Sequence, residues 1–146
     1  MPIRVYRVCR AIHFRLNGIG AMRVGGRWNS PGRPVVYMAE SISLAVLENL
    51  VHLHKDVFPT GYVVVSAEIP DDVSILTEAE IRKNAQTMPS ELGDEWMATL
   101  SSAVLKVPSV VVPKEFNYLL NPAHSEFEKI KPAPPEPFQF DERMFE

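Results

Sequence analysis

The sequence predicts a single compact α+β domain, with a central mixed β-sheet and short flanking helices. Its 146 residues are enough for one domain with a hydrophobic core. Apolar residues make up 46% of the chain and charged residues 23%, which is typical of a folded globular protein and excludes intrinsic disorder. Thirteen prolines favour frequent loops and short helices. Neither an internal repeat nor a second domain is indicated, so we expect residues 1–146 to form one domain.

Runs of apolar and β-branched residues predict the strands of this sheet. Residues 3–8 alternate apolar and basic side chains, and residues 35–38 are apolar as in a strand buried on both faces. Residues 62–69 are rich in β-branched side chains. We expect further strands at residues 109–112, which lie between two prolines, and at residues 117–120.

The first helix is predicted after the second strand. Four glycines and a strong turn sequence predict that residues 18–32 are mainly loop. Ser41 or Ser43 can cap a helix over residues 42–54. Apolar residues occur almost all round this helix, so we expect it to be mostly buried.

Three further short helices are predicted in the second half of the chain. Residues 77–80 fit a capping box that begins a short polar helix. The Met-Pro pair at 88–89 is expected to interrupt helical structure. Asp94 is then expected to cap the next helix. The inner face of that helix is then Met97, Leu100, Ala103 and Val104. Residues 121–127 are expected to form a last short helix, opened by a proline.

The C-terminal end is predicted to be an extended connector followed by a strand or a tail. Residues 131–137 hold four prolines and should be extended. Residues 138–146 read either as a frayed tail or as a docked edge strand. Because Phe138 and Phe140 fall in step, we favour the docked strand.

Charge is distributed unevenly along the chain. The first 33 residues carry seven arginines and no acidic residue, whereas the remaining 113 carry all 18 acidic residues and 8 basic ones. Arginine without lysine suits planar, bidentate binding of an anion such as a phosphate. The overall net charge of −3 argues against a primary nucleic-acid binder, so direct nucleic-acid binding is not expected.

Several common sites and locations lack sequence support. The chain has no GxxxxGK[ST], no GxGxxG after a strand and no GxSxG. Its one cysteine, Cys9, excludes an internal disulfide and a cysteine-based zinc cluster, and we expect it to be a buried thiol. His52 and His54 are two residues apart and so fall on different sides of a helix, which predicts no metal site. With neither a signal-peptide pattern nor an apolar run of ~18 residues, no membrane contact and a cytoplasmic location are expected.

Three residues have patterns that structural roles alone do not readily explain. Glu48 has mostly apolar helical neighbours, so it either lines a cleft or lies in solvent at the helix edge. Arg27 follows two glycines, which permits fork-like contact with a phosphate, although it can equally stack on Trp28 at the surface. Ser109 is more typical of a hydrogen-bonded core hydroxyl than of a catalytic group.

Five collinear segments of the chain resemble the RES domain family. They are residues 25–32 (GGRWNSPG), 36–41 (VYMAES), 45–48 (AVLE), 107–109 (VPS) and 117–124 (NYLLNPAH). The Arg, Glu and Ser that name the family match Arg27, Glu48 and Ser109. Residues 93–96 (GDEW) and 140–143 (FDER) also look like family features. The resemblance covers nearly the whole chain.

The resemblance implies a fold, an activity and a partner. RES proteins are toxins of bacterial type II toxin–antitoxin systems, held in hetero-oligomers by an Xre-like helix-turn-helix antitoxin. Their fold is similar to that of ADP-ribosyltransferases. Studied members degrade NAD by hydrolysis or phosphorolysis, and some ADP-ribosylate a protein. The resemblance therefore predicts NAD as substrate and leaves the acceptor open: water, phosphate or a protein side chain.

The resemblance also assigns roles to residues of this chain. Glu48, Arg27 and Ser109 are the expected catalytic residues: Glu48 stabilises positive charge on the ribose, Arg27 holds the diphosphate and Ser109 orients the ribose or Glu48. Further expected NAD-binding residues are Tyr37, Arg7, Gly26, Trp28, His52 and Asn117. No metal is expected. The alternative class is a non-catalytic, arginine-rich binding module for an acidic partner or RNA, in which Glu48 would be irrelevant.

Overall fold

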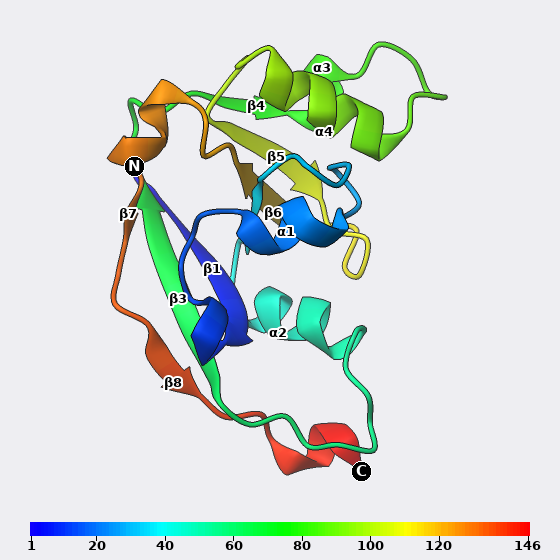
Figure 1. Cartoon of the computed structure of the whole chain (residues 1–146), viewed down its shortest axis with the longest axis vertical. Coiled ribbons are helices and arrows are strands. Elements are labelled where there is room, and N and C mark those ends of the chain that lie inside the picture. The colour runs from blue at the N-terminus through cyan, green and yellow to red at the C-terminus, as the bar shows by residue number, and fades with distance from the viewer.

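A curled, mixed sheet forms the centre of the molecule (Figure 1). The computed structural model describes all residues, 1–146. The strands follow the order β4-β5-β6-β2-β1-β3-β7, and β8 also pairs with β3. Their bounds are β1 Ile3–Arg10, β2 Val36–Ala39, β3 Tyr62–Ile69, β4 Ile75–Thr77, β5 Val104–Pro108, β6 Phe116–Leu120, β7 Lys131–Pro132 and β8 Glu136–Phe138. Only β4 and β5 run parallel, so the predicted mixed sheet is confirmed.

The helices are short and lie around the sheet, as predicted. They are α1 Ile19–Val24, α2 Ile42–Leu50, α3 Glu78–Ile81 and α4 Pro89–Ala98, with 3₁₀ turns at Ala11–His13, Ser125–Lys129 and Glu142–Phe145. In Figure 1, α3 and α4 lie at the β4–β5 end, while α1 and α2 lie near the middle of the molecule. None of these helices has the length and apolar character needed to span a bilayer.

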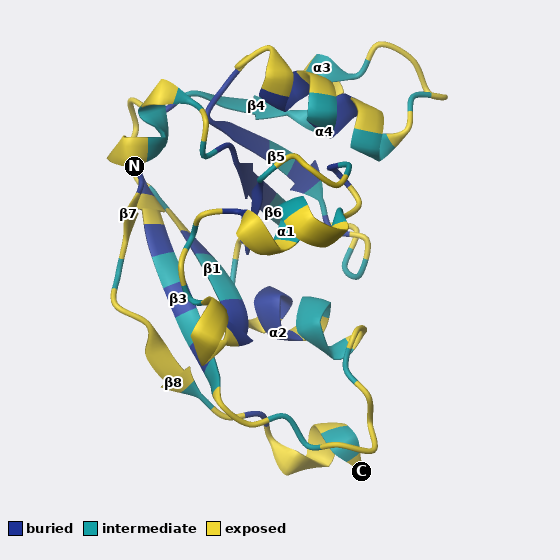
Figure 2. Cartoon of the chain, in the orientation of Figure 1, coloured by how far each residue is buried: buried dark blue, intermediate teal, exposed yellow.

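The sheet is stabilised by apolar packing on both of its faces. One cluster joins β1, β3, β5 and β6 and includes Val5, Ile69, Val104 and Leu120. On other sides, Trp96 of α4 and Leu44 of α2 pack against the strands. Figure 2 shows the buried residues along the strands and on the inward faces of α2 and α4. Burial alternates along β3, as period-two patterning requires.

Local sequence patterns locate several elements correctly. The predicted strands at 3–8, 62–69 and 117–120 correspond to β1, β3 and β6. The Ser41 hydroxyl caps α2 by accepting a hydrogen bond from the Leu44 amide at 3.1 Å. The capping box of α3 is complete, with both of its reciprocal contacts between residues 77 and 80. These contacts use only neighbouring residues, which is why the sequence predicts them.

The C-terminal segment is docked rather than frayed. Glu136–Phe138 pairs with β3, and Phe140 is only 1% exposed. Phe140 forms edge-to-face contacts with Tyr62 and Phe138, with ring centroids 5.2 and 5.0 Å apart. The strand ends at Phe138, however, and a 3₁₀ turn follows at Glu142–Phe145, so residues 139–146 do not continue the expected strand.

The prediction for the α4 region is wrong. Asp94 lies inside α4 and does not cap a helix, because the helix begins at Pro89 in its N1 position. Proline fits there since the first amide of a helix has no intrahelical partner. The helix ends before Leu100, which has a left-handed φ of 53° and is exposed. Val104, predicted on the helix, belongs to β5.

Five other elements differ from expectation. Residues 109–112 do not form a strand. They belong to the turn between β5, which ends at Pro108, and β6. Helix α2 ends at Leu50 rather than near 54, and the exposed Leu47 and Val51 make it less buried than expected. The last helical turn begins at Ser125, capped by the His124 ring, rather than at 121. The sequence also did not predict α1 within the glycine-rich segment, nor the three-residue strand β4.

Candidate active site

A pocket of about 550 Å³ opens between the sheet and the two central helices. Its floor includes Tyr37 and Ala39 of β2, which pair in register with Leu119 and Asn117 of β6. Helices α1 and α2, the strand β1 and the loop that follows α1 line its sides. This volume falls in the range of small-molecule sites. Of the nine site residues predicted from the sequence, all but Ser109 line this pocket.

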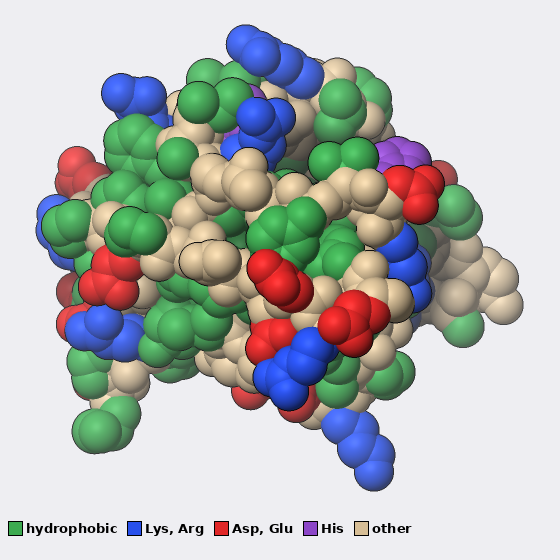
Figure 3. Space-filling view, turned by 90° about the horizontal axis from the view of Figure 1, so that it is seen from below, with side chains coloured by type: hydrophobic (Ala, Val, Ile, Leu, Met, Phe, Trp, Pro, Cys, Tyr) green, Lys and Arg blue, Asp and Glu red, His purple; other side chains and the backbone are tan.

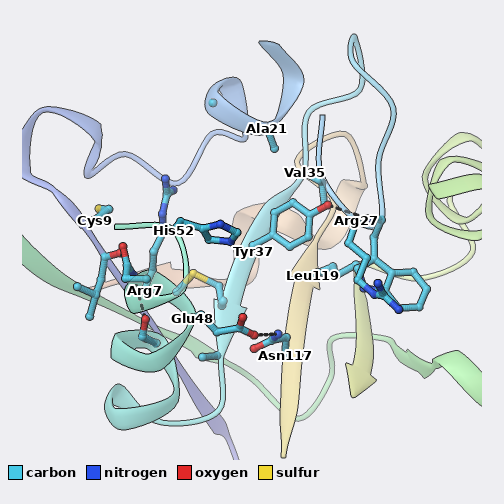
Figure 4. A pocket seen from close by; sticks show the side chains of 18 of the residues that line it. Arg7, Cys9, Ala21, Arg27, Val35, Tyr37, Glu48, His52, Asn117 and Leu119 are labelled. Carbon is cyan, nitrogen blue, oxygen red and sulfur yellow. Dashed lines mark hydrogen bonds between the residues drawn. The ribbon is translucent and has the colours of Figure 1, made fainter. Parts of the chain in front are cut away.

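Glu48 projects from α2 into the pocket and is held on one oxygen (Figure 4). The Asn117 amide donates a hydrogen bond to its Oε2 at 2.5 Å, and the Ser109 hydroxyl donates to the same oxygen at 3.1 Å. Neither donor binds Oε1, and no other protein group does. The carboxylate is therefore oriented by the protein while one oxygen stays available to a ligand. Of the two sequence alternatives for Glu48, the cleft-lining one is confirmed.

Ser109 lies behind Glu48 and is 2% exposed. Its hydroxyl oxygen accepts hydrogen bonds from the amides of Val111 and Val112, both at 3.1 Å. The same hydroxyl donates its own hydrogen bond to Glu48. The two amide contacts to the Ser109 oxygen stabilise a turn after β5, at residues that were expected to form a strand. Because the hydroxyl is fully engaged and Ser109 does not line the pocket, the geometry suits a positioning group rather than a nucleophile.

Arg27 lies at the tip of a tight turn on the other side of the pocket. The turn is closed by backbone hydrogen bonds between Gly26 and Asn29, 2.9 and 3.4 Å long. A Cβ at position 26 would lie 2.8 Å from the Tyr37 hydroxyl, so only glycine allows this close approach. Arg27 is exposed and has no carboxylate within 4.0 Å. Its guanidinium is thus free to bind an anion.

Tyr37 connects the Arg27 turn to the sheet. Its hydroxyl accepts a hydrogen bond from the Trp28 amide at 3.0 Å and donates one to the Asn29 side chain at 2.6 Å. Burial raises the pKa of Tyr37 to about 12. Its only proton is committed to Asn29, which leaves the ring as the part that can contact a ligand. Trp28 also lines the pocket but is only 4% exposed and packs in the core with Trp96.

A second group of basic side chains lies across the pocket from Arg27. Figure 4 shows Arg7 and His52 on one side of Tyr37 and Arg27 on the other. Arg7 is half-buried, His52 is exposed, and neither pairs with a carboxylate. With Arg10, three arginines line the pocket against one carboxylate, so it favours an anionic ligand. The sequence analysis missed Arg10 as a pocket residue because it ended the first strand at residue 8.

The structure contains no cluster of three His, Cys, Asp or Glu side chains suited to a metal ion. Cys9 is buried, as expected, and burial raises the pKa of its thiol. Its sulfur donates a weak hydrogen bond to the His13 carbonyl at 3.6 Å. A buried thiol with a raised pKa is a poor nucleophile, so Cys9 has the structural role predicted for it.

A curled mixed sheet with few helices defines a small α+β domain, and its pocket holds one carboxylate and three arginines. Residues 4–141 match the model of the RES domain, and the chain belongs to this family. The chain is 38% identical to "Prs ADP-ribosylating toxin" of Sphingobium sp. (strain YBL2), over 88% of this chain and 86% of the relative. It is 39% identical to "Toxin Res" of Photorhabdus laumondii, over 86% and 85%.

The fold matches a solved structure as well. A chain of the M. tuberculosis MbcT–MbcA toxin–antitoxin complex superposes with a TM-score of 0.68, covering 99% of this chain and 87% of that one. The sequence identity is 17%, so this match concerns the fold alone.

Proposed function

We propose that this protein binds NAD in the pocket and cleaves the bond between nicotinamide and ribose. The observation that carries the proposal is the asymmetric use of the Glu48 carboxylate. Two protein donors hold Oε2, which fixes the group, while Oε1 has no protein partner. An oriented carboxylate with one available oxygen is suited to a substrate on which positive charge develops.

The chemistry of NAD fits a site with one carboxylate. Breaking this N-glycosidic bond passes through an oxocarbenium-like state on the ribose, as in glycoside hydrolysis. Nicotinamide leaves from a pyridinium and departs as a neutral molecule, so no general acid is required. The remaining task is to stabilise positive charge on the ribose, and Glu48 can do this directly or by accepting a hydrogen bond from a ribose hydroxyl.

The arginines supply the binding half of the proposed site. Arg27 holds the diphosphate by charge-assisted hydrogen bonds, and Arg7 adds positive field from across the pocket. The Tyr37 ring, whose hydroxyl is already engaged, offers a face on which the nicotinamide stacks. His52 and Asn117 complete the proposed contacts, with Asn117 acting mainly through Glu48.

A transferase outcome is the second candidate function. A relative that is 38% identical is named an ADP-ribosylating toxin, which favours transfer of ADP-ribose to a protein side chain. The names of the other relatives favour only a toxin. Mass spectrometry of purified protein incubated with NAD, phosphate and cell extract separates the outcomes. ADP-ribose, ADP-ribose-1-phosphate and a modified protein differ plainly in mass.

We also propose that the protein is a toxin held inactive by an Xre-like antitoxin. The fold match to a chain of a toxin–antitoxin complex and the relatives named "Toxin Res" support this. The basic pocket would attract an acidic or carboxylate-terminated segment of the antitoxin, so NAD and antitoxin should compete. An equilibrium titration tests this: NAD affinity that is unchanged at saturating antitoxin would rule out direct occlusion.

The arginine-rich binding module is less favoured, because the early arginines do not form one surface. Arg7, Arg10 and Arg27 line the pocket, Arg4 pairs with Glu68 at 3.8 Å, and Arg15 lies over the Phe14 ring. On the face drawn in Figure 3, basic side chains are scattered singly among acidic and apolar ones. A binding module would instead show a steep salt dependence of its affinity for RNA or DNA.

Release of free nicotinamide is the direct test of the proposed activity. Purified protein should release it from NAD, and release should continue after treatment with a metal chelator. Expression without antitoxin should stop bacterial growth, and growth should recover with an inactive Glu48 variant. Protein that releases no nicotinamide under any acceptor condition would contradict the proposal. Release that is lost with chelator and restored by zinc or magnesium would contradict its metal-free form.

A further inference from the structure

The turn that carries Arg27 is held by side chains rather than by a strand ladder. Asn29 is 1% exposed, and its amide group donates to the carbonyls of Ala21 and Arg33 at 2.8 and 3.0 Å. Its oxygen accepts from Tyr37. These contacts fix the middle of the turn, and all of them join Asn29 to residues nearby in the sequence. One further anchor comes from a distant part of the chain.

That anchor is Asp94, on the buried side of α4. Its Oδ1 accepts a hydrogen bond from the Ser30 amide at 2.9 Å, and its Oδ2 accepts one from the Ser30 hydroxyl at 2.5 Å. The preceding residue, Gly93, lies against the Trp28 carbonyl, where a Cβ would collide with it. The helix and the turn therefore meet at two adjacent positions. Asp94 has no cationic partner within 4.0 Å, so both of its oxygens serve Ser30 alone.

We propose that Asp94 is a positioning residue for anion binding: by clamping Ser30 from α4, it sets the place of Arg27 at the pocket. The inference rests on the proposed function, which makes NAD the bound anion. It adds that α4, through Asp94, positions the Arg27 side of the pocket. Asp94 touches neither the pocket nor Glu48, so it acts through the turn. Its loss should therefore weaken binding and leave the chemical step intact.

The clamp requires an aspartate for geometric reasons. Both Ser30 groups are donors, and only an ionised carboxylate on a short arm presents two acceptors to them. Asparagine replaces one acceptor with a donor, so one of the two contacts is lost. Glutamate keeps both acceptors but places them one methylene further from the helix. At the observed spacing between α4 and the turn, Asp94 satisfies both Ser30 groups.

The molecule contains a matched control for this clamp. Glu126 accepts hydrogen bonds from the amide and the hydroxyl of Ser74, at 2.9 and 2.6 Å. The donors are again the amide and the hydroxyl of one serine, although both bind the same oxygen, Oε1, and neither residue lines the pocket. Ser74→Ala removes a hydrogen bond from a serine hydroxyl to a carboxylate, as Ser30→Ala does, and should therefore lower folding stability without affecting the Arg27 turn.

Steady-state kinetics of NAD cleavage separate positioning from stability. We expect Asp94→Asn and Ser30→Ala each to raise KM for NAD roughly 10-fold with kcat within about twofold, matching a lost charged hydrogen bond. The double variant should be no worse than the single ones, since both break one contact. Ser74→Ala, the control variant, should leave KM unchanged. An Asp94→Asn variant with unchanged KM, or with the loss confined to kcat, would overturn the proposal.

Hydrogen exchange provides a readout that does not depend on activity. In Asp94→Asn, the amides of residues 26–30 should exchange faster, while those of β3 and β6 keep the rates of the wild type. In the control variant Ser74→Ala, the exchange rates of the amides of residues 26–30 should not change. Unchanged exchange at 26–30 in Asp94→Asn would overturn the clamp whatever the substrate is. Faster exchange in a protein that never cleaves NAD would leave the clamp standing and contradict the proposed function instead.

Discussion

The two walls of the pocket are built in different ways. On the Glu48 wall, Glu48 lies on a capped helix and Asn117 on β6, a strand paired on both sides. On the Arg27 wall, the residue lies in a turn with only one isolated bridge. That turn depends on hydrogen bonds made by the side chains of Asn29, Tyr37 and Asp94.

The difference indicates a division of work between the walls. Regular elements hold a group more accurately than loops do, which suits a carboxylate that must face developing charge. A turn fixed by a few side chains suits an arginine that adapts to a flexible diphosphate. Changes on the Glu48 wall should therefore lower the rate, and changes on the Arg27 wall should lower the affinity.

The largest expected effect is the loss of charge at Glu48. Glu48→Gln keeps the shape and can still accept from Ser109 and Asn117 through its amide oxygen, but it removes the negative charge. We expect kcat for nicotinamide release to fall by about 10²–10³-fold, as when one preorganised electrostatic group is lost from an active site. The affinity for NAD, measured by calorimetry, should change little. Normal turnover in Glu48→Gln would remove Glu48 from the mechanism.

On the opposite wall, Arg27→Ala should act on binding. Losing a charged hydrogen bond to the diphosphate costs about 1.5–3 kcal/mol, which corresponds to a KM raised roughly 10- to 150-fold. Arg23→Ala is the matched control, because it removes the same charge from α1 without lining the pocket. If both variants raised KM equally, the long-range electrostatic effect of the arginine charge would explain the result, rather than a direct contact between Arg27 and the diphosphate.

A smaller effect is expected when Glu48 keeps its charge but loses a support. Asn117→Ala removes the hydrogen bond to Oε2 and leaves the one from Ser109. We expect kcat to fall about 5- to 10-fold, less than for the full loss of charge, because the Ser109 hydrogen bond still orients the carboxylate. In the Glu48→Gln background the same change should have almost no effect, since the two residues act as one unit. Full additivity in this double-mutant cycle would contradict the positioning role of Asn117.

The two walls also differ in how far the sequence predicts them. The apolar neighbours of Glu48 on a capped helix are a local pattern, and they single out this carboxylate, although they leave open whether it lines a cleft or lies in solvent. The two glycines before Arg27 likewise predict an open turn. In each case the observation depends on residues within a few positions of one another, which is the range over which sequence patterns act.

Contacts between distant residues were outside that range. Ser109 and Asn117 reach Glu48 across 61 and 69 residues, and Asp94 reaches Ser30 across 64. Asp94 resembles a helix cap in sequence, yet its carboxylate is taken by Ser30 and the helix begins at Pro89. The valine run after Ser109 resembles a strand, but the Ser109 hydroxyl binds two of its amides and turns the chain. Tertiary hydrogen bonding outweighed local propensity at both places.

The smallest expected effect on NAD cleavage concerns Tyr37, where the walls meet. Tyr37→Phe keeps the ring but leaves the Asn29 oxygen and the Trp28 amide without this partner. At neutral pH we expect NAD cleavage to stay within a few-fold of the wild type, while the free energy of unfolding falls by about 1–3 kcal/mol. Urea denaturation measures this difference between the two proteins.

The same pair of proteins makes a pH-dependent prediction. The pKa of Tyr37 is about 12 in the folded protein against its ordinary value of 10.0, because burial disfavours the phenolate. As the pH rises past 10, the unfolded chain loses this proton first, so the stabilisation is present below pH 10 and is lost as the pH approaches 12. Phenylalanine has no such proton. The difference in unfolding free energy between wild type and Tyr37→Phe should therefore become smaller from about pH 9 to about pH 11. A constant difference across that range would contradict the buried, neutral Tyr37 hydroxyl that joins the two walls.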